Sequence, residues 1–276
     1  MSVARRAFVP ALVLALAAVL TFLLLPVAAL FLQVPPGTLL GRLDDAVVLD
    51  ALRVTAETNL VAQALILGFG TPAAYLLATR RFRGRELVIT LVELPLVLPP
   101  AVAGIGLIAA FGNLGLLGER IDRLGVQVGT RTAVVLAVAF VSSPFYLRSA
   151  IAAFEAVDRG LLDAARTLGA SPARVFARVA LPLAAGGLGA GAALAFARGL
   201  GEFGATIMFA GSLQGVTQTF SLAIYDQFDV DFDVALAIGA LLVVVSGALL
   251  LAVKLVPRWT PSTSTSPLLS ARSSSS

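Results

Sequence analysis

The chain has 276 residues, of which 58% are hydrophobic and only 13% are charged. A soluble globular domain carries roughly 25% charged residues, so this composition indicates a membrane protein with several spans. The sequence has no cysteine and no histidine, which excludes disulfides, thiolate or imidazole metal sites and imidazole catalysis. We predict no metal site. The net charge of +4 does not indicate nucleic-acid binding, because the basic residues flank apolar segments without interleaved aromatic residues.

Six apolar segments approach or exceed the roughly 20 residues that a bilayer span requires. They cover residues 8–32, 54–79, 87–111, 132–147, 183–210 and 234–256, and the fourth is the shortest. We therefore expect an all-α membrane protein with about six transmembrane helices. The first segment follows Arg5 and Arg6 as a signal peptide would, but its apolar run exceeds the usual 7–15 residues. This favours a retained helix, with cleavage as the alternative.

The basic residues predict the orientation, because short loops rich in Lys and Arg stay in the cytoplasm. If the N-terminus is cytoplasmic, most basic residues fall on the cytoplasmic side. The exceptions are Arg42, Arg53, Arg120, Arg123 and Arg131 outside, and Arg198 within a span. Both termini are therefore expected in the cytoplasm, with the chain in the cytoplasmic (inner) cell membrane. The tail, residues 258–276, is rich in Ser, Thr and Pro and is expected to be disordered.

The longest cytoplasmic loop contains a polar segment with the signals of two short helices. Asp158 can cap the first helix, and Gly169 fits the left-handed position just past its end. Ser171 can cap the second helix with Pro172 at its first position, and Pro182 marks the return to the membrane. One apolar stripe at helical spacing is expected on the first helix: Leu161, Leu162, Ala165 and Leu168.

A helix of about 11 residues is marginal alone, so this stripe needs a partner. The spacing alone leaves two interpretations open. The hairpin either contacts another protein, or lies on the bilayer surface or on its own spans.

A longer pattern in the same loop resembles the EAA loop of ABC importer permeases. That loop reads E-A-A, three residues, G, nine residues, I-x-L-P, and this chain matches every gap, with Asp for Glu and Val for Ile. The matching residues are Asp163, Ala164, Ala165, Gly169, Val179, Leu181 and Pro182. The resemblance implies a type I ABC importer permease architecture. It places the permease domain at 54–257, after an N-terminal helix and external loop at 1–53, with a coupling loop at 155–182.

The resemblance also implies the partners. A coupling loop of this kind docks in a separate ATP-hydrolysing subunit, present in two copies. A second copy of this chain and an external oxyanion-binding protein complete such an importer. The chain itself has a single lysine, Lys254 in "LLAVKLV", and therefore no P-loop. We expect it not to be an enzyme and to hold no cofactor, with ATP and Mg²⁺ bound by the partner ATPase.

Two further stretches are similar to molybdate permeases. They are "ELPLVLPPAVAGIGL", residues 93–107, and "FARGLGEFGATIMFAGSLQGVTQTFSLAIYDQFD", residues 196–229. Sulfate permeases share a weaker version of both. The resemblance implies transport of molybdate or tungstate, with sulfate or thiosulfate as the alternative. It assigns no residue as an oxyanion ligand.

Polar and proline residues inside the spans are candidates for the translocation path or its gate. Pro99 and Pro100 lie inside the third span, where they predict either a break that lines the path or an ordinary kink. Arg198 and Glu202 stand one turn apart in the fifth span and are expected to pair, which favours a lock near the gate over an anion site. Glu93 is a further intramembrane carboxylate.

Two other patterns in the spans lead to different interpretations. "GLGEFG", residues 199–204, matches a dinucleotide motif but lies in an apolar span and follows no strand, so we reject that function. Gly187 and Gly191 are typical of close helix packing. The rival function from another class is an ion-coupled secondary transporter, with Glu57, Glu93, Glu202 and Arg198 as its relay.

Overall fold

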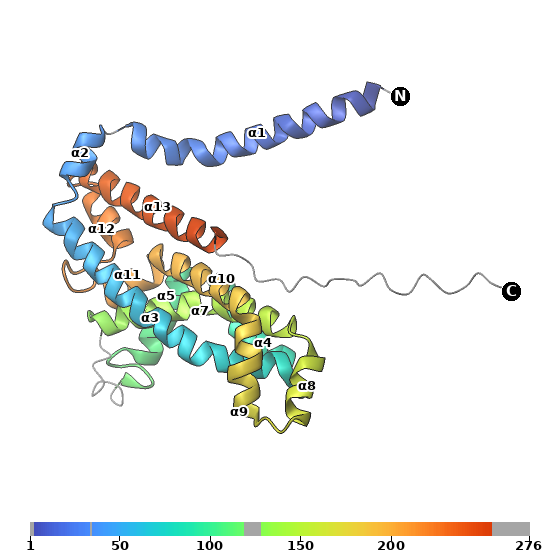
Figure 1. Ribbon diagram of the computed structural model, residues 1–276. Coiled ribbons are helices and arrows are strands. Elements are labelled where there is room, and N and C mark those ends of the chain that lie inside the picture. The colour runs from blue at the N-terminus through green and yellow to red at the C-terminus, as the bar shows by residue number, and fades with distance from the viewer. Residues whose placement is uncertain (1–2, 34, 119–127, 256–276) are drawn as a thin grey trace.

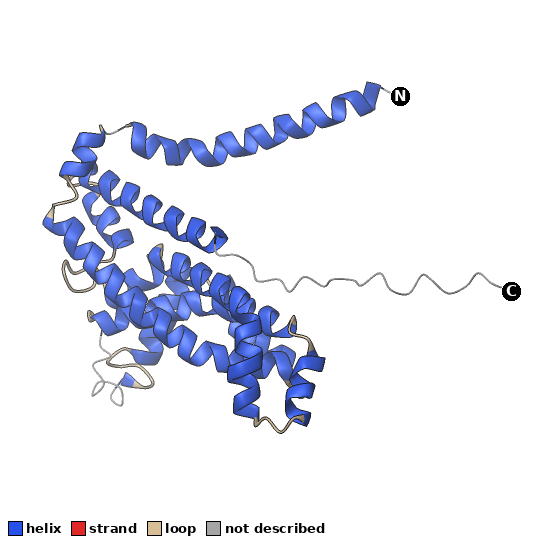
Figure 2. Ribbon diagram, in the orientation of Figure 1, coloured by secondary structure: helices blue, strands red, loops and turns tan. Residues whose placement is uncertain are grey.

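The computed structural model describes residues 3–33, 35–118 and 128–255, and every regular element within these ranges is a helix (Figure 2). The predicted disordered tail and the external arginines Arg120 and Arg123 lie outside the described residues. The helices are α1 (Val3–Leu32), α2 (Pro36–Gly41), α3 (Ala46–Thr79), α4 (Arg85–Val97), α5 (Pro100–Phe111), α7 (Arg131–Glu155), α8 (Arg159–Thr167), α9 (Pro172–Val175), the π-helical segment η2 (Phe176–Ala180), α10 (Leu181–Leu200), α11 (Gly204–Ala210), α12 (Phe220–Gln227) and α13 (Phe232–Leu255).

The described chain confirms the predicted all-α class and the approximate number of spans. Five helical stretches are long and apolar enough to cross a membrane: Phe8–Leu32, Ala46–Thr79, Arg131–Glu155, Pro172–Leu200 and Phe232–Ala252. The third predicted segment, 87–111, is instead a pair of helices, α4 and α5, bent by 115°. Counted as one broken span, this pair makes up to six.

Three predicted spans have different bounds in the structure. The second, predicted at 54–79, begins earlier, at Ala46. The fourth, predicted as the shortest, is the full 25-residue helix α7, because "RSAIAAFE" after residue 147 continues as helix despite its charged ends. The fifth, predicted at 183–210, is wrong at both ends. Its helix starts earlier, at Pro172, and stops at Leu200, after which a short break leads into α11.

Helices α3, α7 and α10 form the centre of the molecule, and small residues let them approach closely. A Cβ added at Gly187 would lie 2.5 Å from the Cβ of Ala153, and one at Gly191 would lie 2.6 Å from that of Ser149. Any side chain at either glycine would therefore push α10 away from α7. This confirms that the two glycines serve helix packing.

The helices extend between two distinct ends of the molecule (Figure 1). Helices α8 and α9 lie at one end of α3, α7 and α10, while α2 and α12 lie at the other. Helix α1 contacts the bundle only near its C-terminal end, at α13, and none of its apolar stretch is buried, as expected for side chains that face lipid or another chain. On the predicted orientation, α8 and α9 are cytoplasmic.

Candidate functional site

The cytoplasmic hairpin, residues 155–182, is shaped by local backbone chemistry. The side chain of Asp158 accepts a hydrogen bond from the amide of Gly160 at 2.7 Å, which caps α8. At its other end, the amide of Gly169 donates to the carbonyl of Arg166 and the amide of Ala170 donates to that of Ala165, both at 3.0 Å. This is a Schellman end, and Gly169 occupies its left-handed position with φ of +83°. The predicted corner is confirmed.

The second arm of the hairpin differs from the prediction at Pro182. Ser171 caps α9 as predicted, accepting from the amide of Arg174 at 3.4 Å. However, the helix does not restart at Pro182, because one continuous helical stretch runs from Pro172 to Leu200. The π-helical segment η2 precedes the proline, and Leu181 donates its amide to the carbonyl of Phe176, five residues back. This wider turn makes room for the proline ring without breaking the helix.

The apolar stripe predicted on α8 is divided between two faces. Leu162 is buried, and Ala165 packs against the same core, whereas Leu161 is 49% exposed and Leu168 is 88% exposed. A single stripe of four residues was expected. Leu161 and Leu168 are seven positions apart, so they lie on the same edge of the helix, and that edge faces outward. Ala164 is also exposed. The hairpin therefore presents an outward face of Leu161, Ala164 and Leu168, which no other described residue of this chain covers.

The inward face of the hairpin is fixed to the spans by aromatic rings that the sequence analysis did not single out. Phe176 lies 4.8 Å from Tyr75 of α3 and 6.2 Å from Phe154 of α7, measured between ring centroids, and Tyr75 and Phe154 are 5.3 Å apart. Val175 is fully buried beside them, and Val179 and Leu181 pack on the same core. A movement of the hairpin must therefore displace α3 and α7.

The remaining predicted hairpin residues lie on its surface. Asp163 pairs with Arg166 one turn away, with 2.6 Å between Oδ1 and Nη1, and both side chains are more than half exposed. Pro182 is exposed as well. The root of the hairpin is held by Arg85, whose Nε donates to the carbonyl of Leu77 at 2.6 Å and whose Nη2 pairs with Glu155. The neighbouring Glu86 also pairs with Arg85, at 2.6 Å, but no local pattern links Arg85 to Leu77 of α3 or Glu155 of α7.

The second candidate region is where the two broken helices meet, and we call it the broken-span junction (residues 98–100 and 201–204). Pro99 caps α5 and Pro100 is its first residue, so the prolines cause a break and not a mild kink. A Cβ added at Gly204 would lie 2.5 Å from the Cβ of Pro100. One added at Gly104 would lie 2.6 Å from the Cβ of Met208. The half-helices α5 and α11 are thus in close contact.

A buried ion pair lies at this junction, as the sequence predicts. Glu202 is 1% exposed, and its Oε2 lies 2.6 Å from Nη2 of Arg198. Its other oxygen accepts from the amide of Ala205 at 2.7 Å, which satisfies a free donor in the first turn of α11. The carboxylate therefore joins the end of α10 to the start of α11. Glu93 lies elsewhere, on α4, and pairs with Arg148 at 3.1 Å in a half-exposed contact with α7.

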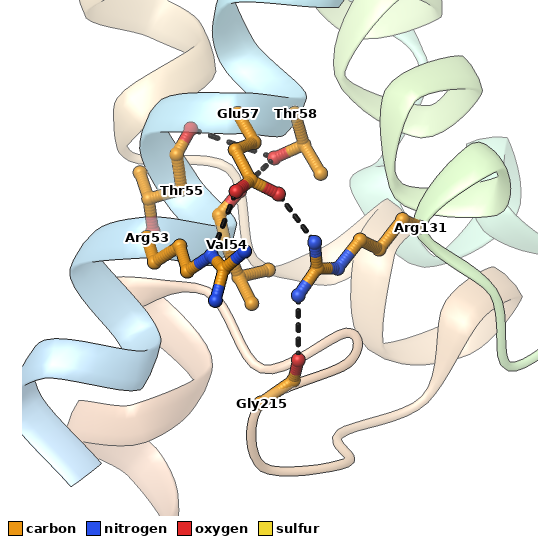
Figure 3. A network of polar contacts seen from close by, with 7 residues as sticks. All are labelled: Arg53, Val54, Thr55, Glu57, Thr58, Arg131 and Gly215. Atoms are coloured by element: carbon orange, nitrogen blue, oxygen red, sulfur yellow. Dashed lines mark hydrogen bonds and ion pairs between the residues drawn. The ribbon is translucent and has the colours of Figure 1, made fainter. Parts of the chain in front are cut away.

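A polar network at the opposite end from the hairpin brings together residues that the sequence does not link (Figure 3). Glu57 of α3 accepts from Arg53 through one oxygen, at 2.8 Å, and pairs with Arg131 of α7 through the other. Arg131 also donates to the carbonyl of Gly215, at 2.8 Å. We call these four residues the outer network. From the sequence, Glu57 was expected only in the relay of the rival ion-coupled transporter.

These features define a multi-span membrane protein with a cytoplasmic hairpin whose outer face is exposed among the described residues. Residues 70–259 match the family model described as "Binding-protein-dependent transport system inner membrane component". The chain belongs to this family. It is accordingly a multi-pass inner-membrane permease subunit of an ABC importer and not itself catalytic, since ATP binding in this family lies on a partner ATPase.

The chain is similar in sequence to molybdenum permeases and, at lower identity, to a sulfate permease. The chain is 41% identical to the molybdenum transport system permease protein ModB of Mycobacterium tuberculosis, over 85% of this chain and 89% of that protein. It is 42% identical to a probable molybdenum ABC transporter permease of Haloferax volcanii, over 69% of this chain and 70% of that protein. It is 34% identical to the sulfate transport system permease protein CysT of Escherichia coli, over 91% of this chain and 94% of that protein.

Solved structures support the fold at low sequence identity. A bacterial alginate ABC transporter in complex with a pentasaccharide-bound periplasmic protein aligns with a TM-score of 0.70, at 16% identity, over 91% of this chain and 94% of that chain. The inward-facing MetNI methionine ABC transporter aligns with a TM-score of 0.59, at 18% identity, over 74% and 91%. Both are importer structures, and the predicted type I permease architecture is confirmed.

Proposed function

We propose that this chain is the translocating subunit of an ATP-driven molybdate importer. The observation that carries this proposal is the 41% identity to a molybdenum permease across 85% of the chain, against 34% for a sulfate permease. Molybdate and sulfate are tetrahedral dianions of similar geometry, so tungstate and sulfate are the competitors that a test must include. The functional unit would contain two copies of this chain, two ATPase subunits and an external oxyanion-binding protein.

The hairpin supports a coupling role through the contrast between its two faces. Its inward face is anchored by Phe176 and Val175, and its outward face exposes Leu161 and Leu168. Exposed leucines on a capped polar hairpin suit a groove on another protein. We propose that this groove belongs to the ATPase, and that Asp163, Ala164 and Gly169 fix how the hairpin fits. ATP and Mg²⁺ would be bound there and not in this chain.

The broken-span junction is proposed as part of the gate. Helix breaks at membrane depth are tolerated where they are buried in protein or line a water-filled path, and here two breaks face each other at Pro100 and Gly204. Arg198 is neutralised by Glu202, so we assign this pair the task of holding the junction and not of binding the anion. Pro99 and Glu93 would lie beside the path that forms between two copies.

An ion-coupled secondary transporter needs carboxylates that are free to take up protons. Glu57, Glu93 and Glu202 each pair with an arginine in the described part of the chain. The family itself is that of binding-protein-dependent systems. Both observations favour the ATP-driven function.

The deciding experiment measures uptake of labelled molybdate in a bacterial strain that lacks its own molybdate permease. The strain would carry this chain with its ATPase and binding protein. We expect uptake that requires the ATPase, and that unlabelled tungstate inhibits more strongly than an equal concentration of sulfate. Uptake of sulfate in preference to molybdate would reassign the substrate. Uptake that persists without the ATPase would refute the ATP-driven mechanism.

A further inference from the structure

Arg131 connects three segments that are far apart in the sequence (Figure 3). It is the first residue of α7, and the two ends of its guanidinium serve different partners. Nη1 pairs with Glu57 of α3, and Nη2 donates to the carbonyl of Gly215 at 2.8 Å, in the loop between α11 and α12. A guanidinium can hold two acceptors in a fixed relative geometry, which a lysine ammonium does not do.

The loop that Arg131 holds, residues 211–219, is compact enough to transmit a displacement. The carbonyl of Leu213 accepts from the amides of Val216, Thr217 and Gln218 at 2.9–3.0 Å. Gly211 and Gly215 have φ of +69° and +71°, which permits this tight path.

The first residue of α12, directly after this loop, makes a second connection to α3, and the loop itself has an exposed tip. The amide of Phe220 donates to Oγ1 of Thr55 at 2.9 Å, in a buried contact. Gln214 adds a hydrogen bond to Asp50 at 3.0 Å. Leu213 is 54% exposed and Val216 is 42% exposed. On the predicted orientation this tip faces the outside, where a binding protein would approach.

Helix α7 provides the connection from this loop to the hairpin. Its 25 residues span about 37 Å at a rise of about 1.5 Å per residue. At its inner end, Phe154 packs against Phe176 of the hairpin and Glu155 pairs with Arg85. Between the two ends α7 is the most buried of the candidate spans. Dense packing of this kind has low compressibility and transmits strain along the helix.

We propose that Arg131 is a positioning residue that couples the outer loop 211–219 to the hairpin through α7. Docking of the binding protein on the loop would be transmitted by the Gly215 contact to Arg131, along α7, and to the hairpin on which the ATPase sits. This proposal rests on the proposed importer function. The side chains of Arg131 and Glu57 are each about 40% exposed, and exposed ion pairs add little to folding stability. Its removal should therefore affect coupling more than folding.

The test compares ATP hydrolysis by the complete transporter in nanodiscs, with and without molybdate-loaded binding protein. Arg131→Gln removes both contacts, and we expect stimulation by the binding protein to fall about 5-fold or more, a typical size for coupling between sites. Basal hydrolysis and co-purification with the ATPase should be unchanged. Arg131→Lys keeps the charge but loses the planar guanidinium that binds two acceptors at once. We expect an intermediate stimulation in this variant.

Arg53→Gln is the matched control. Arg53 contacts the other oxygen of Glu57 from within the same helix and is 71% exposed, so its loss leaves both contacts of Arg131 in place. We expect stimulation in this variant to equal that of the original chain.

Three outcomes would overturn the proposal. Full stimulation in Arg131→Gln would refute it while leaving the importer function intact. An equal loss in Arg53→Gln and Arg131→Gln would show that general surface charge matters and not the link through Gly215. If the original chain shows no stimulation by the binding protein, the importer function fails and this proposal fails with it. If the Arg131→Gln transporter does not assemble, the Arg131→Lys variant replaces it. Full stimulation by the binding protein in Arg131→Lys would then refute the proposal.

Discussion

The cytoplasmic hairpin and the broken-span junction are both bends in an otherwise helical chain, yet they are made in different ways. In the hairpin, each bend has its own local cause, such as the cap at Asp158 and the left-handed Gly169. At the junction, the bends at Pro100 and Gly204 fit against each other although they lie over a hundred positions apart in the chain. The hairpin is thus a locally encoded structure, and the junction depends on tertiary packing.

The two regions also differ in what a substitution should disturb. Leu168 of the hairpin is 88% exposed, whereas Glu202 of the junction is 1% exposed. Changes at the junction should therefore reduce folding stability first. Changes on the outer face of the hairpin should leave folding intact and weaken the contact with a partner.

The largest effect on stability is expected from Glu202→Ala. The substitution leaves Arg198 without its partner and the amide of Ala205 without its acceptor. Breaking a fully buried pair costs about 3–5 kcal/mol, and since Arg198 keeps about a quarter of its exposure, we expect about 2–4 kcal/mol. Thermal unfolding in detergent, monitored by the loss of the monodisperse peak on heating, measures this loss of stability. A variant as stable as the original would show that the pair does not hold the junction.

The contact between the half-helices gives the next largest effect. In Gly104→Ala, the new Cβ would lie 2.6 Å from that of Met208, so we expect a loss of about 1–3 kcal/mol from overpacking. Gly106→Ala is the control on the same helix, because nothing lies within 4 Å of its added Cβ. That variant should be neutral or more stable by up to about 1 kcal/mol. Equal behaviour of the two variants in the same unfolding assay would contradict the close contact of α5 and α11.

The outer face of the hairpin should show the opposite pattern. Leu168→Glu should change the unfolding free energy by less than about 0.5 kcal/mol, as is usual for exposed positions. Association with the ATPase should weaken by about 1–3 kcal/mol if Leu168 is a buried anchor of that interface. Pull-down of the ATPase at graded concentrations measures the association. Unchanged binding would exclude Leu168 from the interface.

Much of the hairpin could be predicted from the sequence because caps, proline and glycine act within a few residues. Asp158, Gly169 and Ser171 all have their predicted roles. The prediction was wrong where a feature depends on neighbours from other helices. The stripe on α8 splits because only Leu162 and Ala165 reach the core that α3 and α7 provide.

The junction and the outer network were predictable only in fragments. The Arg198–Glu202 pair was expected because both charges are one turn apart on one helix. The break at Pro99 and Pro100 was one of two options, since a proline permits either a kink or a break and the packing decides. Arg131 could not be connected to Glu57 or to Gly215, because no short-range pattern relates three separate segments.

The central claim is that the shape of the hairpin couples this permease to its ATPase, and Gly169 tests it most directly. Its φ of +83° strains most residues other than glycine, above all β-branched ones, while nothing lies within 4 Å of an added Cβ. Asparagine tolerates this conformation. We therefore compare Gly169→Val with Gly169→Asn in ATP-dependent molybdate uptake by proteoliposomes. We expect equal membrane insertion of both variants, near-normal uptake for Gly169→Asn and a loss of about tenfold or more for Gly169→Val. Normal uptake by Gly169→Val would contradict the central claim.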